Sequence, residues 1–186
     1  RNAFYWFTMS LFYATLITGL CLIFSGGALI FTKARAQKFL TAFPRSKQAT
    51  FYTMAIAMTW FSYRLLNLSP SDFGDYKHIL LLLFLAITLA SFYFVPDFLS
   101  VRATAGIALL IADTLLDAAF MREPSERLFL VGFVYAMIVL AFIIGTSPYL
   151  MRDSLNWLYK KALRVKLLAY SLIAYGSILL WATLSY

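Results

Sequence analysis

Charged residues, cysteine and histidine are all scarce in this sequence. Only 13% of its 186 residues are charged, and it contains a single cysteine, Cys21, and a single histidine, His78. One cysteine cannot form a disulfide within the chain, and one residue of each kind cannot supply the ligand spacing of a structural zinc site. We therefore exclude a disulfide-stabilised scaffold and a Cys/His metal centre.

The residues that remain are mostly apolar. Hydrophobic residues make up 62% of the chain, and its mean hydropathy is +0.79. A soluble domain of this length carries more charge, because its surface must be solvated by water. The composition therefore predicts a protein whose exterior faces lipid. The segments between the apolar stretches are too short to fold separately, so we expect a single transmembrane domain over residues 1–186.

Six apolar stretches are long enough to cross a hydrocarbon core of about 30 Å as α-helices. Runs such as 79–85 do not alternate between polar and apolar residues, as the strands of a membrane β-barrel would. We therefore predict an all-α, polytopic membrane bundle of about six transmembrane helices with short loops. Their approximate bounds are residues 4–31, 50–68, 77–95, 103–121, 128–146 and 167–186.

The first stretch could also be compared with a signal peptide. It is too long for the apolar core of a signal peptide and has no clear A-x-A cleavage site, so we interpret it as a transmembrane span. The sequence begins with Arg1 and not with Met, which indicates a processed chain or a segment that precedes it.

The net charge of +8 is distributed unevenly along the chain. If the loops alternate between the two sides of the membrane, most basic residues lie on one side and four acidic residues lie on the other. The positive-inside rule places the basic side in the cytoplasm and both ends of the sequence on the opposite side. This distribution also accounts for the charge without nucleic acid, so we expect no nucleic-acid partner.

Two of the basic segments have the pattern of helices that lie in the membrane interface. Residues 33–43 contain good helix formers. In residues 151–165 the basic side chains lie off an apolar face formed by Leu155, Leu158, Ala162 and Val165. We predict contacts with anionic lipid headgroups, and ordinary loop charge is the alternative. The predicted contacts are Lys33, Arg35, Lys38, Arg45, Lys47, Arg152, Lys160, Lys161, Arg164 and Lys166.

The sharpest feature lies in the fourth stretch, which contains two aspartates. Asp113 and Asp117 are four residues apart, so both carboxylates lie on one face of a helix. A charged side chain in lipid costs about 3 kcal/mol on insertion scales, so it should face protein or water. Arg64 of the second stretch lies at a depth similar to that of Asp117. We predict an ion pair between Arg64 and Asp117, with Asp113 either sharing the guanidinium or protonated.

This group of three residues has three alternative roles. It can hold two helices in register, it can form part of a proton or ion pathway through Asp113, or it can bind a ligand. Aromatic residues make up 18% of the chain, which indicates packing against lipid and helices or a site for a flat ligand such as a quinone or another pigment. His78, at the outer end of the third stretch, is typical of an interfacial residue.

The sequence contains no HExxH, no P-loop, no GxGxxG and no nucleophile motif around a serine. An enzyme is therefore the weakest of three function classes. We expect a non-catalytic integral membrane subunit of a larger membrane protein assembly, whose partners are membrane lipids and other membrane subunits and whose cofactor, if any, is a bound lipid, quinone or pigment. The alternative is a small ion- or proton-coupled transporter or channel that uses Asp113, Asp117 and Arg64.

Overall fold

The computed structural model of the chain describes residues 9–68, 74–95, 97–123 and 125–186. Within these ranges the chain is helical and contains no strand. The α-helices are α1 (Leu11–Phe31), α2 (Lys33–Ala42), α3 (Lys47–Leu66), α4 (Lys77–Phe94), α5 (Leu99–Ala119), α6 (Arg127–Thr146), α7 (Tyr149–Tyr159) and α8 (Ala162–Ala182). Three short 3-10 helices, η2 (Phe43–Arg45), η4 (Gly74–Tyr76) and η5 (Thr183–Ser185), adjoin α2, α4 and α8.

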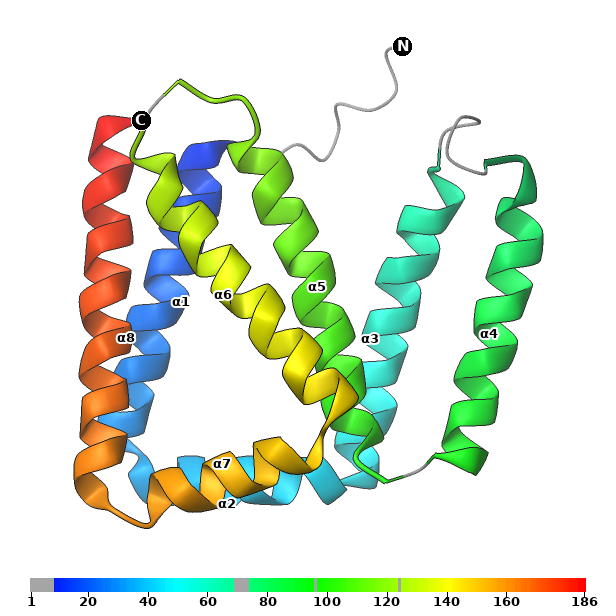
Figure 1. The fold of residues 1–186 in the computed structure, drawn as a ribbon, viewed down its shortest axis with the longest axis horizontal. Helices are drawn as coiled ribbons and strands as arrows, with labels where there is room; N and C mark the ends of the chain where they lie inside the picture. The colour runs from blue at the N-terminus through cyan, green and yellow to red at the C-terminus, as the bar shows by residue number, and fades with distance from the viewer. Residues whose placement is uncertain (1–8, 69–73, 96, 124) are drawn as a thin grey trace.

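The six helices of 18 to 21 residues run between the same two ends of the molecule, and the two shorter α-helices lie across one of these ends (Figure 1). α2 and α7 are these two shorter helices, as expected from the pattern of residues 33–43 and 151–165. The start of α1 and the end of α8 lie at the opposite end. The arrangement is a bundle closed at one end by two transverse helices.

Within the described residues, five helices are long and apolar enough to cross a membrane, which is compatible with a multi-pass membrane protein. They are α1, α4 together with η4, α5, α6, and α8 extended through η5. The second predicted span corresponds to α3, which is not among the five. α3 carries Lys47, Gln48 and Arg64, together with several threonines, so its composition is less apolar than that of its neighbours.

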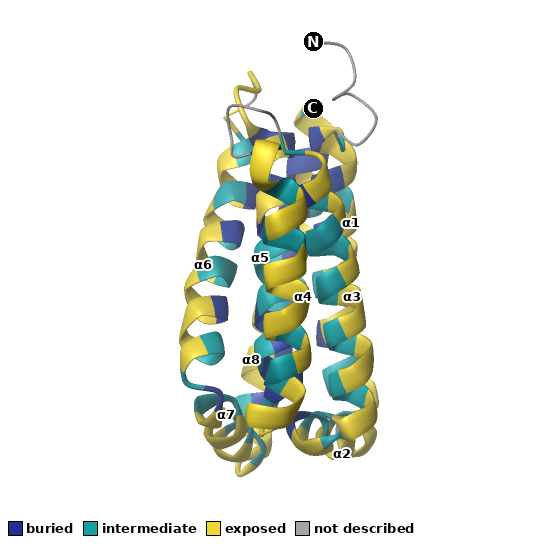
Figure 2. Cartoon of the chain, turned by 90° about the vertical axis from the view of Figure 1, so that its right-hand side faces the viewer, coloured by how far each residue is buried: buried dark blue, intermediate teal, exposed yellow. Residues whose placement is uncertain are grey.

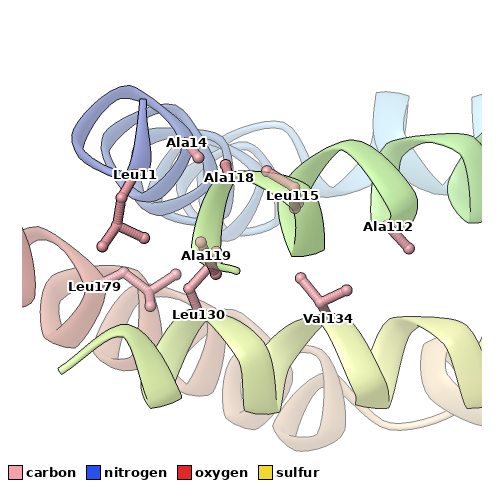
Figure 3. Packing of buried hydrophobic residues seen from close by; sticks show 9 residues of the cluster. All are labelled: Leu11, Ala14, Ala112, Leu115, Ala118, Ala119, Leu130, Val134 and Leu179. Carbon is pink, nitrogen blue, oxygen red and sulfur yellow. The ribbon is translucent and has the colours of Figure 1, made fainter. Parts of the chain in front are cut away.

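The hydrophobic core lies at the end of the bundle opposite the transverse helices. Its buried residues come from the start of α1, the end of α5, the start of α6 and the end of α8. Figure 3 shows Leu130 and Val134 of α6 facing Leu115 and Ala119 of α5. α4 lies outside this core. It faces the viewer in Figure 2, has no buried residue among those described, and packs on α3 through the rings of Phe61 and Phe84.

The starts of α1 and α5 lie four or more residues from the predicted bounds. α1 begins at Leu11 and not at residue 4, because the Ser10 Oγ caps it by accepting a hydrogen bond of 3.4 Å from the backbone N–H of Tyr13. Residues 4–8 of the predicted span lie outside the described residues. α5 begins at Leu99, before the predicted residue 103, because Phe98 turns the chain with a φ of 57°.

The predicted interfacial helix over residues 151–165 is wrong in its C-terminal part. α7 ends at Tyr159, Lys161 is extended, and α8 begins at Ala162 instead of residue 167. Val165 is therefore a buried residue of α8. The corner is held by Arg164, whose Nη1 donates a hydrogen bond of 2.7 Å to the carbonyl oxygen of Trp157. This bond satisfies a carbonyl that the end of α7 would otherwise leave unpaired.

Candidate functional site

The candidate site lies between two neighbouring helices, α3 and α5, which run in the same direction (Figure 1). Arg64 lies in the last turn of α3. Asp113 and Asp117 lie in the second half of α5, one helical turn apart. Because α4 returns the chain to the opposite end, the C-terminal turns of α3 and α5 come side by side. This topology brings together the three side chains that the sequence singles out.

One guanidinium contacts both carboxylates. The Nη2 of Arg64 forms an ion pair with the Oδ2 of Asp113 and lies 3.5 Å from the Oδ2 of Asp117. The sequence predicted Asp117 as the main partner, whereas the structure makes the contact with Asp113 the closer one. Side chains of a helix point back toward its N-terminus, so the guanidinium of Arg64 reaches about one turn deeper than its own Cα. That depth matches Asp113.

The three side chains lie on the surface of the bundle. The exposed fraction is 36% for Arg64, 52% for Asp113 and 63% for Asp117. The opposite face of α5 is buried, with Ala112 and Leu115 in the hydrophobic core. If both carboxylates are ionised, two negative charges share one positive charge. The site is therefore an exposed acidic face of α5 with one cation from α3.

The predicted lipid-contacting residues gather at the end that α2 and α7 close (Figure 1). Lys33 is the first residue of α2, and its side chain lies outside the described part of the structure. Arg164 is half-buried, because its guanidinium lies 3.9 Å from the centroid of the Trp157 ring. The other predicted residues are exposed, namely Arg35, Lys38, Arg45, Lys47, Arg152, Lys160, Lys161 and Lys166.

A cavity of about 370 Å³, which no local sequence pattern indicated, lies between α1, α6 and α8. Its lining is largely apolar, and it includes Phe133 and Tyr175, whose ring centroids are 6.1 Å apart. The hydroxyl of Tyr175 donates a hydrogen bond of 2.8 Å to the carbonyl oxygen of Phe129, which fixes the tyrosine against α6. None of the three residues of the candidate site lines this cavity.

In the ranges that the structure describes, no group of three or more His, Cys, Asp or Glu side chains could hold a metal ion. His78 lies exposed in the first turn of α4. Comparisons with protein-family models, with curated proteins and with solved structures gave no match. The function must therefore be argued from the site itself.

Proposed function

We propose that this chain is a non-catalytic integral membrane subunit that docks against a partner membrane protein through the exposed face of α3 and α5. The observation that carries this proposal is the exposure of Asp113 and Asp117 on one long helix, α5, of a strongly apolar bundle. A carboxylate that faces lipid costs about 3 kcal/mol at the centre of a transmembrane helix. A partner that covers this face removes that cost.

The charge of the face indicates the kind of partner. Arg64 supplies one positive charge to two carboxylates, and its contact with Asp113 is the closer one. Asp117, the most exposed of the three, is left without a full counter-charge. The matching partner is a transmembrane helix that carries Lys or Arg at the depth of Asp117, because charged groups within membranes pair with one another.

The proposal includes six spans and an orientation. α3 lies alongside the other long helices, and Arg64 faces two carboxylates, which lowers the cost that its charge would have in lipid. With α3 as the sixth span, the basic end formed by α2 and α7 faces the cytoplasm under the positive-inside rule. Both ends of the described chain then lie on the non-cytoplasmic side. α4, which has no buried residue and packs on α3 through Phe84, faces lipid on its remaining surface.

Site-specific photo-crosslinking in the native membrane tests the proposal. A photoreactive residue at Phe120, the exposed C-cap residue of α5 three positions after Asp117, should crosslink to one membrane protein in stoichiometric amounts. The same residue at Leu82 on α4, also exposed, should capture lipid. The double variant Asp113→Asn/Asp117→Asn should lose the crosslinked protein, whereas Asp75→Asn, in the exposed η4, should keep it. Capture of lipid alone from Phe120 would overturn the proposal.

A proton-coupled transporter is the second candidate, and one observation favours it. Two carboxylates within one helical turn share a single guanidinium, so one of them can exchange a proton while the other keeps the ion pair. Proton flux into proteoliposomes containing the purified chain separates the two candidates. Under the transporter candidate, Asp113→Asn abolishes a flux that Asp75→Asn retains. Under the subunit proposal, the wild-type chain alone gives no flux above that of empty liposomes.

A further inference from the structure

The basic end of the molecule contains a cavity of about 280 Å³ between η2, the turn before α5, and α7. Two arginines, Arg45 and Arg152, line this cavity, together with the amide of Asn156. Phe98 and Leu155 supply an apolar wall to the same cavity. The volume is close to the lower limit of about 300 Å³ that is typical of small-molecule sites.

Hydrogen bonds fix both arginine-bearing walls. η2 is tied to α5, because the Ser100 Oγ donates a hydrogen bond of 3.1 Å to the carbonyl oxygen of Phe43. Arg45 is the last residue of η2 and follows the buried Pro44, so its backbone position is constrained. On α7, the Nε of Arg152 donates a hydrogen bond of 2.9 Å to Asp153, which orients the guanidinium.

The charge around the cavity favours an anion. Exposed basic residues of α2, η2, α7 and the start of α8 lie at the same end of the molecule, and the acidic residues described at this end are Asp97 and Asp153. Asp153 balances the charge of Arg152, so the net positive charge of the cavity comes from Arg45, and this charge favours an anion that contacts both guanidinium groups. The fork of an arginine matches the oxygens of a phosphate, and an amide N–H adds a further donor.

We propose that this cavity binds a phosphate group, and that an anionic membrane lipid supplies it. Two observations favour a lipid over a water-soluble phosphate compound. The cavity lies beside α2 and α7, the two helices that cross the end of the bundle where lipid headgroups would meet it (Figure 1). Its wall also includes Phe98 and Leu155, which suit the glycerol and upper acyl region of a lipid.

Lipid binding to the full chain in nanodiscs tests this proposal. The purified protein is placed in phosphatidylcholine nanodiscs that contain a minor fraction of phosphatidylglycerol, and the retained lipid is counted by native mass spectrometry. Wild-type protein should retain phosphatidylglycerol, and Arg45→Gln/Arg152→Gln should weaken its binding about tenfold or more. The control Lys77→Gln/Arg122→Gln removes the same charge at the opposite end of the bundle, outside the cavity and outside the predicted headgroup contacts, and should bind as wild type does.

A second arm identifies the source of the phosphate. Inorganic phosphate is titrated against the protein in nanodiscs of phosphatidylcholine alone, and the melting temperature is recorded. In one outcome, the melting temperature rises with phosphate in the wild type and the control but not in Arg45→Gln/Arg152→Gln. If the protein also retains no phosphatidylglycerol, these results would support the phosphate site but overturn its assignment to a lipid. Equal behaviour of Arg45→Gln/Arg152→Gln and of the control at the opposite end toward both probes would overturn the site itself. Asn156→Ala, which changes no charge, should weaken binding a few-fold and guards against misfolding of the charge variants.

Discussion

Gly19 of α1 and Gly176 of α8 lie so close together that neither position has room for a side chain. A Cβ at Gly19 would lie 3.0 Å from the carbonyl oxygen of Gly176, and a Cβ at Gly176 would lie 2.8 Å from that of Gly19. α1 and α8 are equally close at Gly26 of α1, where a Cβ would lie 2.7 Å from the carbonyl oxygen of Ala169. Helices in lipid associate mainly by close packing, since lipid tails are as apolar as their side chains.

The glycine contact predicts a sharp difference between two adjacent positions. Gly26→Ala should lower the free energy of unfolding by about 1–3 kcal/mol, because its Cβ must push α8 away from α1. Gly27→Ala is the matched control, since no atom lies within 4 Å of its Cβ. Alanine is also the better helix former by up to about 1 kcal/mol, so this variant should be as stable as the wild type or more so. Unfolding by sodium dodecyl sulfate in mixed micelles measures both, and equal stability of the two variants would contradict the packing.

Removing Arg64 should cost more stability than removing either aspartate alone. Arg64→Met leaves Asp113 and Asp117 facing each other without a cation, whereas Asp117→Asn leaves the closer ion pair with Asp113 in place. We expect a loss of roughly 1–2 kcal/mol for Arg64→Met and less for Asp117→Asn, because the group is partly exposed. Thermal unfolding in nanodiscs measures the difference. Arg122→Met removes an exposed arginine at the same end and should have no effect, and an equal loss in that variant would rule out the ion pair as the cause.

The candidate site could be predicted because depth in a membrane follows from position along a span. Arg64 and Asp117 lie at similar distances from the ends of two predicted spans that run in the same direction, so the sequence predicts a similar depth in the membrane for both. The closer contact with Asp113 could not be predicted, since it depends on how far the arginine side chain extends back along α3. The exposure of the carboxylates depends on which face of α5 packs against the core. The spacing between Asp113 and Asp117 shows that they share a face but not whether that face is buried.

The helix bounds show where sequence patterns stop being informative. Apolar runs predicted the long helices, and the amphipathic pattern predicted two transverse helices. The break at Lys160 and Lys161 was missed, because no glycine or proline marks it and the apolar spacing continues through it. The cavities and the contact between Gly19 and Gly176 join segments far apart in the chain, so no local pattern indicates them.

The corner between α7 and α8 should depend on one arginine. Arg164 donates a hydrogen bond to the carbonyl oxygen of Trp157 and lies over its ring at 3.9 Å. Arg164→Ala removes a C-terminal cap and a cation–π contact, for an expected loss of about 1–2 kcal/mol. Hydrogen exchange should accelerate in the last turn of α7 in this variant. Lys166→Ala, an exposed cation in the same turn of α8, should leave exchange in α7 unchanged, and the idea fails if both variants behave alike.

Tyr159 carries a buried hydroxyl that accepts and donates no hydrogen bond among the described residues. Burial raises the pKa of this tyrosine above its ordinary value of 10.0, because the charged phenolate is poorly solvated there. The folded protein therefore holds the proton to a higher pH than the unfolded chain does. The free energy of unfolding is unaffected below pH 10.0 and falls as the pH rises through the raised pKa.

Replacing Tyr159 with phenylalanine should remove both the fall in the free energy of unfolding at high pH and an unsatisfied polar group. At neutral pH Tyr159→Phe should be as stable as the wild type or more stable by up to about 1 kcal/mol, because no hydrogen bond within the described chain is lost. Above pH 10.0 its stability should fall less steeply than that of the wild type. Tyr149→Phe, at an exposed position of the same helix, should follow the wild-type curve. Chemical unfolding from pH 7 to 11.5 measures the three curves, and a Tyr159→Phe curve that parallels the wild type would show that this hydroxyl is solvated.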